Sequence, residues 1–379
     1  MKKLANIILI PLIMVSTFSC SGSAEKGTAD SRLVKTGSME LKYAHEFSVD
    51  YYENDLAVLT IGSDKFLIAP QEADINDDTY GMTVIRRPAE NIYVAASSAM
   101  DLFDGIGKLS DVKMTSTSAV NWSLPGIRES VESGDISYIG KYSSPDYEFL
   151  VSKECGLAVE STMIYHSPEV REQIESLGIP VIVERSSYET HPLGRMEWIK
   201  LYGLLTGDTE TAETYFSEKT EAFEALSTDD IPESERKTAA FFSVTSNGSF
   251  TIRKPGDYVS KMIDLAGGRY IFTSSDLNVD DNSLSTMNIQ AETFYDIARD
   301  ADILIYNSTI EGEITSISEL VGKSSILSDI KAVKEGNVWC TGQNMFQQTT
   351  GAADMICDLN AVFTDTYDSA DLTYLHRLE

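Results

Sequence analysis

The chain has 379 residues, of which 42% are hydrophobic and 9% aromatic, so it can bury a real core and is long enough for two domains. It carries 30 Lys and Arg against 59 Asp and Glu, a formal net charge of −29. That charge argues against a nucleic-acid partner, because phosphates demand clustered basic side chains, and it suits a soluble protein outside the cell.

The N-terminus has the pattern of a targeting segment. Lys2 and Lys3 precede a short apolar run, residues 4–15, which is too short to span a bilayer as a stable helix. Cys20 and a polar stretch follow, a pattern similar to a bacterial lipoprotein signal in which Cys20 becomes the lipidated N-terminus. Thr17 stands where that pattern prefers leucine, which leaves an ordinary secretory signal as the alternative.

Either signal predicts an extracytoplasmic protein. The lipoprotein pattern implies a signal over residues 1–20, a flexible tether over 21–39, and membrane attachment through the lipid alone. Whether the location is a cell surface or a periplasm stays open.

Cysteine and histidine usage does not indicate a disulfide framework or a metal site. Cys155, Cys340 and Cys357 are odd in number and widely spaced; Cys340 and Cys357 could pair, or all three are small core residues. The four histidines, at positions 45, 166, 191 and 376, form no helical pair. The sequence therefore predicts no directly bound metal.

The first part of the chain is predicted to be β-rich and then to alternate strands with helices. Residues 56–61 and 65–68 flank Gly62-Ser63-Asp64 as a hairpin. From residue 91, short apolar strands alternate with amphipathic helices: strands at 92–96, 112–115, 157–159 and 180–183, and helices at 99–106, 145–153, 168–177 and 193–205. Such alternation predicts a parallel sheet with helices on both faces.

Residues 207–226 are predicted to form the helix that connects two similar halves. Gly207 ends the preceding helix and Asp208 caps the next. The expected buried stripe is apolar except at Lys219 and consists of Ala212, Tyr215, Phe216, Lys219, Ala222, Phe223 and Leu226. As a helix the segment spans about 30 Å.

After a polar gap, strand–helix alternation resumes. Strands are predicted at 239–244, 270–272, 302–306 and 337–341, and helices at 258–266, 289–299 and 349–363. The predicted fold is α/β: two Rossmann-like lobes with parallel-rich sheets joined by one long α-helix, with a β-rich N-terminal extension. The predicted boundaries are 40–206 for the first lobe and its extension, 207–236 for the connecting helix and linker, and 237–379 for the second lobe.

One acidic residue recurs at the same place in each lobe. Ser144 is a plausible N-cap with Pro145 at the first helical position, and Asn288 is a plausible N-cap in the second lobe. Counted from these caps, Glu148 and Glu292 both occupy the fourth position. The alternative is that both are solvated acids favoured by the helix dipole.

Several of these segments resemble the class III solute-binding proteins of ABC importers, which take up iron–siderophore complexes, haem and cobalamin. The similar segments are GIPVIV at 178–183, LYGLLTG at 201–207, LAGG at 265–268, ADILI at 301–305 and AVKEGNV at 332–338. The similarity covers about residues 91–363. The β-rich extension and residues 191–198 are not general features of the family and suggest a subgroup.

The resemblance implies a bilobed clamp that binds its ligand between the lobes and closes by small angles. In the family, a glutamate on each lobe docks against arginine pockets of the two permease subunits, which gives Glu148 and Glu292 that role. The expected partners are an ABC permease homodimer with its ATPase and a small-molecule nutrient. The protein is expected to be a monomer without a cofactor, its ligand being a metal chelate or tetrapyrrole.

Ligand-binding candidates lie in loops at the carboxyl ends of the predicted strands, where parallel sheets bind ligands. Trp122 in a polar loop could stack on a flat ligand, or cover the core of its own lobe. Arg195 could pair with an anionic ligand, or with Glu197 or Glu189.

The second lobe offers further candidates. Arg253 is predicted in the loop after the first strand of the second lobe, where it could face the cleft. Met345 with Phe346 forms an apolar pair that suits a large amphipathic ligand or packs under the last helix. Tyr142 is a weaker candidate, as are Tyr165 and Tyr188.

Other classes of function lack a matching motif. The chain contains no phosphate-binding G-x-x-x-x-G-K-[ST] or G-x-G-x-x-G and no G-x-S-x-G elbow, so an enzyme is not expected. The remaining alternatives are a cobalamin- or haem-specific member of the same class, and a surface sensor or adhesin without a transport role.

Overall fold

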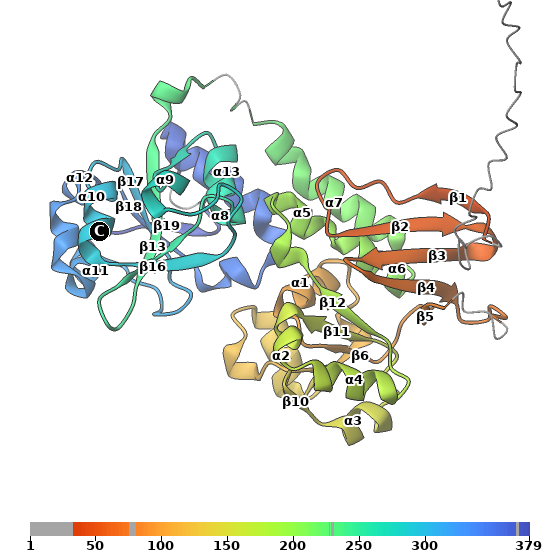
Figure 1. Ribbon diagram of the computed structural model, residues 1–379. Coiled ribbons are helices and arrows are strands. Elements are labelled where there is room, and N and C mark those ends of the chain that lie inside the picture. Colours follow the sequence, from red (N-terminus) through yellow and green to blue (C-terminus); the bar gives the residue numbers. More distant parts are fainter. Residues whose placement is uncertain (1–32, 76–80, 227, 229–230, 369–370) are drawn as a thin grey trace, which may run out of the picture.

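The computed structural model describes residues 33–75, 81–226, 228, 231–368 and 371–379. Cys20, the predicted signal and most of the predicted tether lie outside these residues. Three larger sheets organise the described chain: one near its beginning and one in each of two lobes (Figure 1). The expected α/β architecture with a β-rich extension is confirmed.

The N-terminal extension is a five-stranded sheet separate from the lobes. Its strands, in spatial order, are β1 (Lys35–Ser38), β2 (Phe47–Tyr52), β3 (Leu56–Ile61), β4 (Asp64–Pro70) and β5 (Thr83–Arg87). Neighbours are antiparallel except β4 and β5, which are parallel. The predicted hairpin is present as β3 and β4, and Gly62 turns it with φ of 57°, a conformation that favours glycine.

The N-terminal lobe has a five-stranded parallel sheet in the order β12-β11-β6-β7-β8. The strands are β6 (Ile92–Val94), β7 (Val112–Thr115), β8 (Ser137–Tyr138), β11 (Ala158–Ser161) and β12 (Val181–Glu184), with a small hairpin of β9 (Gly140–Lys141) and β10 (Ser144–Pro145). The helices are α1 (Ser97–Gly105), α2 (Pro125–Ser133), α3 (Tyr147–Ser152), α4 (Pro168–Ser176), α5 (Pro192–Glu197) and α6 (Ile199–Thr206). The single helix predicted for residues 193–205 is therefore two helices that meet at Trp198.

Helix α7 (Thr209–Glu224) packs against α6 of the N-terminal lobe and against α13 of the other lobe. Gly207 ends α6 with φ of 77°, and the Asp208 side chain accepts a hydrogen bond from the Thr211 N–H at 3.4 Å, as the sequence predicts. The buried side of α7 differs from the prediction in one place, because Thr220 is buried and Ala222 is exposed.

The C-terminal lobe has a seven-stranded mixed sheet in the order β16-β14-β13-β17-β18-β19, with β15 beside β13. Its strands are β13 (Thr238–Val244), β14 (Phe250–Arg253), β15 (Arg269–Tyr270), β16 (Thr286–Ile289), β17 (Ile303–Tyr306), β18 (Val338–Thr341) and β19 (Leu375–Arg377). Its helices are α8 (Tyr258–Leu265), α9 (Ser274–Leu277), α10 (Ala291–Ala298), α11 (Ile317–Lys323), α12 (Lys331–Glu335) and α13 (Ala352–Thr364). The prediction missed β14 and β16, which pair antiparallel at one edge.

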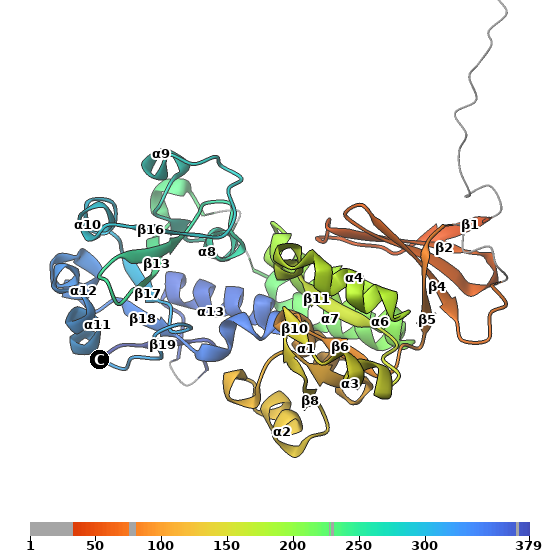
Figure 2. The same cartoon turned by 60° about the horizontal axis from the view of Figure 1, so that its bottom comes forward.

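One continuous hydrophobic core extends from Met39 of the extension to Leu378 of the C-terminal lobe. A second, smaller core lies on the other face of the sheet of the N-terminal lobe, beneath α3 and α4. Figures 1 and 2 show α7 and α13 running between the lobes, with the β1–β5 sheet of the extension at the end of the molecule opposite the C-terminal lobe. Side chains of the two lobes therefore pack against one another, and the lobes are joined by more than a single linker.

Candidate functional site

The loops at the carboxyl ends of the parallel strands meet between the two lobes. The Ser123 N–H donates to Oε1 of Gln347 at 2.7 Å, and Nε2 of Gln347 donates to the Asn121 carbonyl oxygen at 2.7 Å. These residues follow β7 and β18, respectively. Since open parallel sheets bind ligands at this edge, the space between the lobes is the candidate site.

A polar cleft of about 510 Å³ opens beside this contact. Both lobes line it: Asp101, Asp104, Ser123, Leu124, Pro125, Gly126 and Arg128 from one, and Glu313, Gln343, Asn344 and Gln348 from the other. Asp101 is nearly buried and accepts a hydrogen bond from the Thr350 N–H at 2.7 Å, and burial raises its pKa to about 6. This wall offers carboxylates and amides for hydrogen bonds with polar ligand groups.

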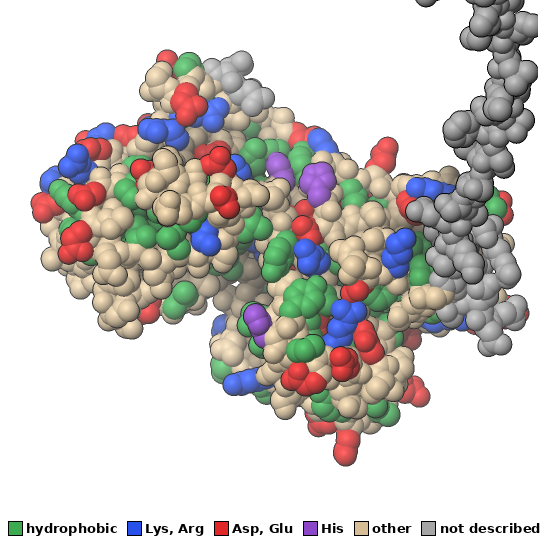
Figure 3. All heavy atoms as spheres, in the orientation of Figure 1, with side chains coloured by type: hydrophobic (Ala, Val, Ile, Leu, Met, Phe, Trp, Pro, Cys, Tyr) green, Lys and Arg blue, Asp and Glu red, His purple; other side chains and the backbone are tan. Residues whose placement is uncertain are grey.

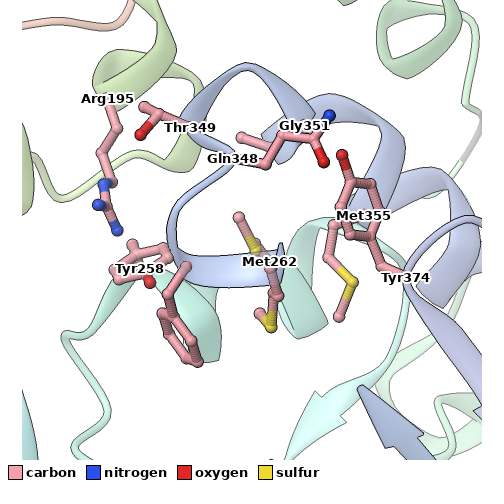
Figure 4. A pocket seen from close by; sticks show the side chains of 11 residues that line it. Arg195, Tyr258, Met262, Gln348, Thr349, Gly351, Met355 and Tyr374 are labelled. Carbon is pink, nitrogen blue, oxygen red and sulfur yellow. The ribbon is translucent and has the colours of Figure 1, made fainter. Parts of the chain in front are cut away.

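An arginine–aromatic cluster joins the lobes next to this cleft (Figure 4). The guanidinium carbon of Arg195, from α5, lies 3.9 Å from the ring centroid of Tyr258, the first residue of α8. The Phe346 ring is 6.4 Å from that of Tyr258 and nearly perpendicular to it. The guanidinium carbon of Arg253 lies 4.6 Å from the Phe346 centroid, and its Nη1 lies 3.5 Å from Oδ2 of Asp257. Stacking on rings stabilises both cations where water is scarce.

The Arg195 guanidinium also borders a small pocket of about 20 Å³. The pocket is mostly apolar and is lined by Arg195, Tyr258, Met262, Met345, Phe346, Gln348, Thr349, Gly351, Ala352, Met355 and Tyr374. Arg195 is only 8% exposed, and its Nε–H has no hydrogen-bond partner among the described residues. A buried cation in this state is costly unless an anionic or accepting group reaches it, and the pocket has room for one such group.

The carboxylates that the sequence offered as partners of Arg195 are engaged elsewhere. Glu197 accepts hydrogen bonds from the N–H groups of residues 42–44 and pairs with Lys200 at 3.1 Å. Glu189 accepts from the N–H groups of residues 45 and 46 and from the Trp198 indole. Arg195 is thus left for the interface between the lobes.

The structure brings together four of the predicted ligand-binding residues: Arg195, Arg253, Met345 and Phe346. That these four residues bind a ligand stays a prediction. One detail is corrected, because Arg253 ends strand β14 and is not in a loop. Alternating residues of that strand are buried, and a tyrosine hydroxyl binds the Arg253 backbone.

The other two predicted ligand-binding residues lie elsewhere. Trp122 is fully buried, and its Nε1–H donates to the Thr117 carbonyl oxygen at 3.2 Å. The prediction that Trp122 presents its ring to a ligand is therefore wrong for this structure, because the ring covers the core of its own lobe. Tyr142 lies in the turn between β9 and β10 and packs on the second core, away from the cluster at Arg195.

Sequence reasoning missed three residues of the site: Asp101, Tyr258 and Gln347. Asp101 is one of many acidic residues on predicted helices, and only burial against Thr350 distinguishes it. Tyr258 stood at a predicted helix start, where its ring could not be assigned a direction. Gln347 bridges to the other lobe, a contact that no local pattern announces.

Glu148 and Glu292 are both exposed and hold equivalent positions in their helices. The caps differ from the prediction: Asp146 caps α3, accepting from the Phe149 N–H at 3.0 Å, and Gln290 precedes α10. Ser144 is instead part of β10, and both predicted caps fall two residues early. Each glutamate is therefore the second residue of its helix.

These two helices lie toward the outer ends of their lobes, away from α7 (Figure 1). The carboxylates are thus presented on the body of each lobe rather than inside the cleft.

Residues 96–345 match the periplasmic binding protein family. This match spans more than half of the chain. The chain belongs to this family. Its members are solute-binding proteins, a class defined by ligand capture and not by catalysis.

Relatives by sequence and by structure agree with this assignment. An uncharacterised lipoprotein of Methanocaldococcus jannaschii is 24% identical, over 92% of this chain and 89% of its own. The periplasmic haem-binding protein HutB of Vibrio cholerae is similar in structure, with a TM-score of 0.56 at 16% identity over 70% of this chain and 97% of its own. A periplasmic haem-binding protein of Pseudomonas aeruginosa has a TM-score of 0.59 at 12% identity over 77% of this chain and 98% of its own. At such identities the structural likeness establishes the shared fold.

Two further properties of this family member concern membranes and metals. Within the described residues, no helix combines the length and the hydrophobicity needed to cross a membrane. The same part of the chain contains no group of three or more His, Cys, Asp or Glu arranged to hold a metal ion. Cys155, Cys340 and Cys357 are free thiols, so Cys340 and Cys357 do not pair here.

Proposed function

We propose that this protein is an extracytoplasmic lipoprotein of an ABC importer, which binds a chelated-iron or metal–tetrapyrrole complex between its lobes and delivers it to the permease. The observation that carries the proposal is the Arg195–Tyr258 contact beside the cleft, where a cation of one lobe meets an aromatic ring of the other. A ligand that reaches this point would touch both lobes at once. The names of the haem-binding proteins of similar fold support this class of ligand.

The cluster combines features suited to a large amphipathic, anionic chelate. Arg195 offers a planar donor fork with a free Nε–H, which matches a carboxylate better than a lysine would. Phe346 and Met345 offer apolar surface. The polar cleft wall nearby can accept the hydroxyl and amide groups that siderophores and corrinoids carry.

Ligand binding is tested with a panel of ferric siderophores, haemin and cyanocobalamin, by equilibrium dialysis with absorbance detection. At least one complex is expected to bind, and Arg195→Met is expected to weaken an anionic ligand about ten-fold or more. Arg299→Met, at an exposed arginine beyond α10, is the control and should change nothing. If the wild-type protein binds no member of the panel, the proposal is wrong.

The proposed contact with the permease uses Glu148 and Glu292. Both carboxylates stand on the first turn of a helix, exposed to solvent, so neither has to be stripped from a buried partner before it can meet a basic pocket. Charge pairing at two separate points sets the register of docking and speeds encounter.

Transport in cells or vesicles that contain the permease tests this contact. Changing both Glu148 and Glu292 to alanine should leave ligand affinity intact and reduce transport strongly. Glu172→Ala with Glu335→Ala, at exposed helical acids of the same two lobes, is the matched control. Undiminished transport by the first pair would contradict the docking role, and transport that never depends on the protein would favour a sensor or adhesin.

Membrane attachment is proposed to depend on Cys20. Cys20→Ala should move the protein from the membrane fraction to the soluble fraction, whereas Ser19→Ala should not. A protein that stays soluble with Cys20 intact would point to the ordinary secretory signal.

A further inference from the structure

Exposed apolar side chains gather at the carboxyl edges of the parallel strands. Among the described residues, the large hydrophobic side chains with substantial exposure that follow such strands are Val120 after β7, Met163 and Tyr165 after β11, Tyr188 after β12, and Ile310 after β17. Figure 3 shows green hydrophobic side chains on the N-terminal lobe beside the hollow between the lobes. Apolar surface left open at a ligand-binding edge marks a surface that something covers.

Two of these side chains, Tyr165 and Tyr188, lie beside the same arginine, Arg185. The guanidinium carbon of Arg185 lies 4.8 Å from the ring centroid of Tyr188. Tyr165, from the loop after the neighbouring strand β11, lies near enough to Arg185 to help raise the pKa of its guanidinium. Tyr165 is 50% exposed and Tyr188 is 41% exposed, so both rings have open surface, and the Tyr188 ring is stacked against the arginine.

The N-terminal extension holds Arg185 in place. Nε of Arg185 donates to Oε2 of Glu46 at 2.7 Å. Glu46 lies just before β2, and its own backbone N–H is bound by the buried Glu189 carboxylate at 2.9 Å. Burial lowers the pKa of Arg185, but the bonds to Glu46 and Tyr165 outweigh it, so the guanidinium stays charged and engaged. The Arg185 guanidinium is therefore held beside the Tyr188 ring and is not available to bind an anionic ligand group.

Arg185 and Tyr188 also lie close to Arg195 in the sequence. Strand β12 ends at Glu184, Arg185 and Tyr188 follow it, and α5 with Arg195 comes next. Since α5 packs against α8 and α13 of the other lobe, the segment after β12 runs from the rings to the interface between the lobes. Figure 1 shows β11 and β12 leading toward α5.

We propose that Tyr165, Arg185 and Tyr188 form a stacking platform for a ligand with a flat, unsaturated face, and that Glu46 of the extension positions this platform. The inference rests on the proposed function and narrows its substrate class to tetrapyrroles and aryl-bearing chelates such as catecholates. Aliphatic hydroxamate chelates, which have no such face, are excluded as the preferred cargo. Aromatic rings and guanidinium planes favour offset stacking on flat ligands.

The platform is tested by measuring dissociation constants for haemin, cyanocobalamin, a ferric tris-catecholate and ferrioxamine B. The variants are Tyr165→Ala with Tyr188→Ala, the matching pair to phenylalanine, and Leu177→Ala. Leu177 is a 37% exposed apolar residue between α4 and β12, at the opposite edge of the same sheet. Because the tyrosines are exposed, the changes should leave the melting temperature nearly unchanged.

The alanine pair should weaken the best-binding flat ligand about ten-fold or more, whereas the phenylalanine pair and Leu177→Ala should stay within about two-fold of wild type. Equal binding by wild type and the alanine pair overturns the platform and leaves the proposed function standing. If ferrioxamine B binds most tightly and its affinity depends on neither tyrosine, the platform is also overturned and the proposed function still stands. A wild-type protein that binds no probe overturns the proposed function itself.

The role of Glu46 has its own readout. Glu46→Ala should weaken the flat ligand in the wild-type background but have no further effect in the Tyr188→Ala background, because the two act through the same ring. Independent, additive losses would show that Glu46 acts only on general stability and would overturn its positioning role.

Discussion

Glu160 is an ionisable residue that no part of the proposed binding site uses. It ends up fully buried on β11, on the face that carries the second core, near the equally buried Tyr93. Neither carboxylate oxygen has a well-formed hydrogen-bond partner among the described residues. Burial raises its pKa to about 8, against 4.5 in an exposed chain, and the nearby Ser161 amide offsets this only in part.

This residue makes the stability of the protein fall as pH rises. Between about pH 4.5 and pH 8 the folded protein keeps a proton that the unfolded chain has already lost, so the free energy of unfolding decreases by up to about 1.4 kcal/mol per pH unit. Urea unfolding of wild type and Glu160→Gln at pH 5 and pH 8 tests this. From pH 5 to pH 8 the free energy of unfolding should fall by a few kcal/mol more in the wild type than in Glu160→Gln. Parallel pH profiles of the two proteins would refute the raised pKa of Glu160.

At the level of elements, the N-terminal extension is attached through two carboxylates. Glu197 and Glu189 accept successive backbone N–H groups from residues 42–46, each at 2.7 to 3.1 Å. Both acids lie in the segment 189–198, which also carries Arg195. The extension is therefore attached to the segment that carries Arg195 and contacts the other lobe.

Glu197→Ala should lower the free energy of unfolding by about 2–4 kcal/mol, because it leaves the N–H groups of residues 42–44 without their acceptor and removes one of the two carboxylates that pair with buried Lys200. Glu197→Gln, which keeps one acceptor oxygen, should lose less. Glu213, an exposed partner of the same lysine, provides the control variant Glu213→Ala, expected within about 0.5 kcal/mol of wild type. Urea unfolding measures all three, and an Ala loss no larger than the control would contradict this account.

The turn from α6 into α7 depends on a close approach at Gly203. A Cβ there would lie 2.5 Å from Cβ of Ala212 and 3.0 Å from the Asp208 carbonyl oxygen. Gly203→Ala should therefore lower the melting temperature measurably, with a cost of about 1–3 kcal/mol. Gly322→Ala, in α11 with open space around the added methyl group, should be neutral or slightly stabilising.

At the scale of the whole molecule, the lobes are joined by more than α7. Lys219 of α7 pairs with Asp354 of α13 at 2.8 Å, Thr349 donates from Oγ1 to the Ser98 carbonyl oxygen at 2.8 Å, and the hydrophobic core is continuous. Packed interfaces of this kind resist large rotations.

Ligand addition should therefore change the radius of gyration by roughly 1 Å or less in small-angle scattering. Scattering is compared before and after saturation with the tightest ligand of the panel, and Arg195→Met at the same ligand concentration serves as the control with lower occupancy. A compaction of several ångströms would show that the contacts between the lobes open in solution, contrary to this expectation.

Much of the fold could be predicted because the patterns that specify it lie within short stretches of consecutive residues. The alternation of apolar strands and amphipathic helices predicts both lobes, and Gly207 with Asp208 predicts the start of α7. Predictions failed where a short strand at a sheet edge resembles a loop, as for β14 at Phe250–Arg253, or where a Ser-Pro pair imitates a helix start that Asp146 in fact provides.

The candidate site was only partly predictable. Arg195 and Phe346 were identified by residue type and by loop position, but the ring between them, Tyr258, was not. The polar loop around Trp122 predicts a ring that is free for a ligand, yet the ring is fully buried among its neighbours in the hydrophobic core. Side-chain direction in loops depends on such neighbours, which periodicity cannot reveal.

The fold class, the two lobes and the connecting helix follow from the amino-acid sequence alone, because hydrophobic periodicity and helix stop signals act over a few neighbouring residues. Three features appear only when the chain is folded: Arg195 stacks on Tyr258, Glu197 binds the extension, and Tyr165 and Tyr188 are exposed while Trp122 is buried. These contacts join segments far apart in the chain, and burial and unpaired polar atoms are properties of that packing rather than of any local pattern.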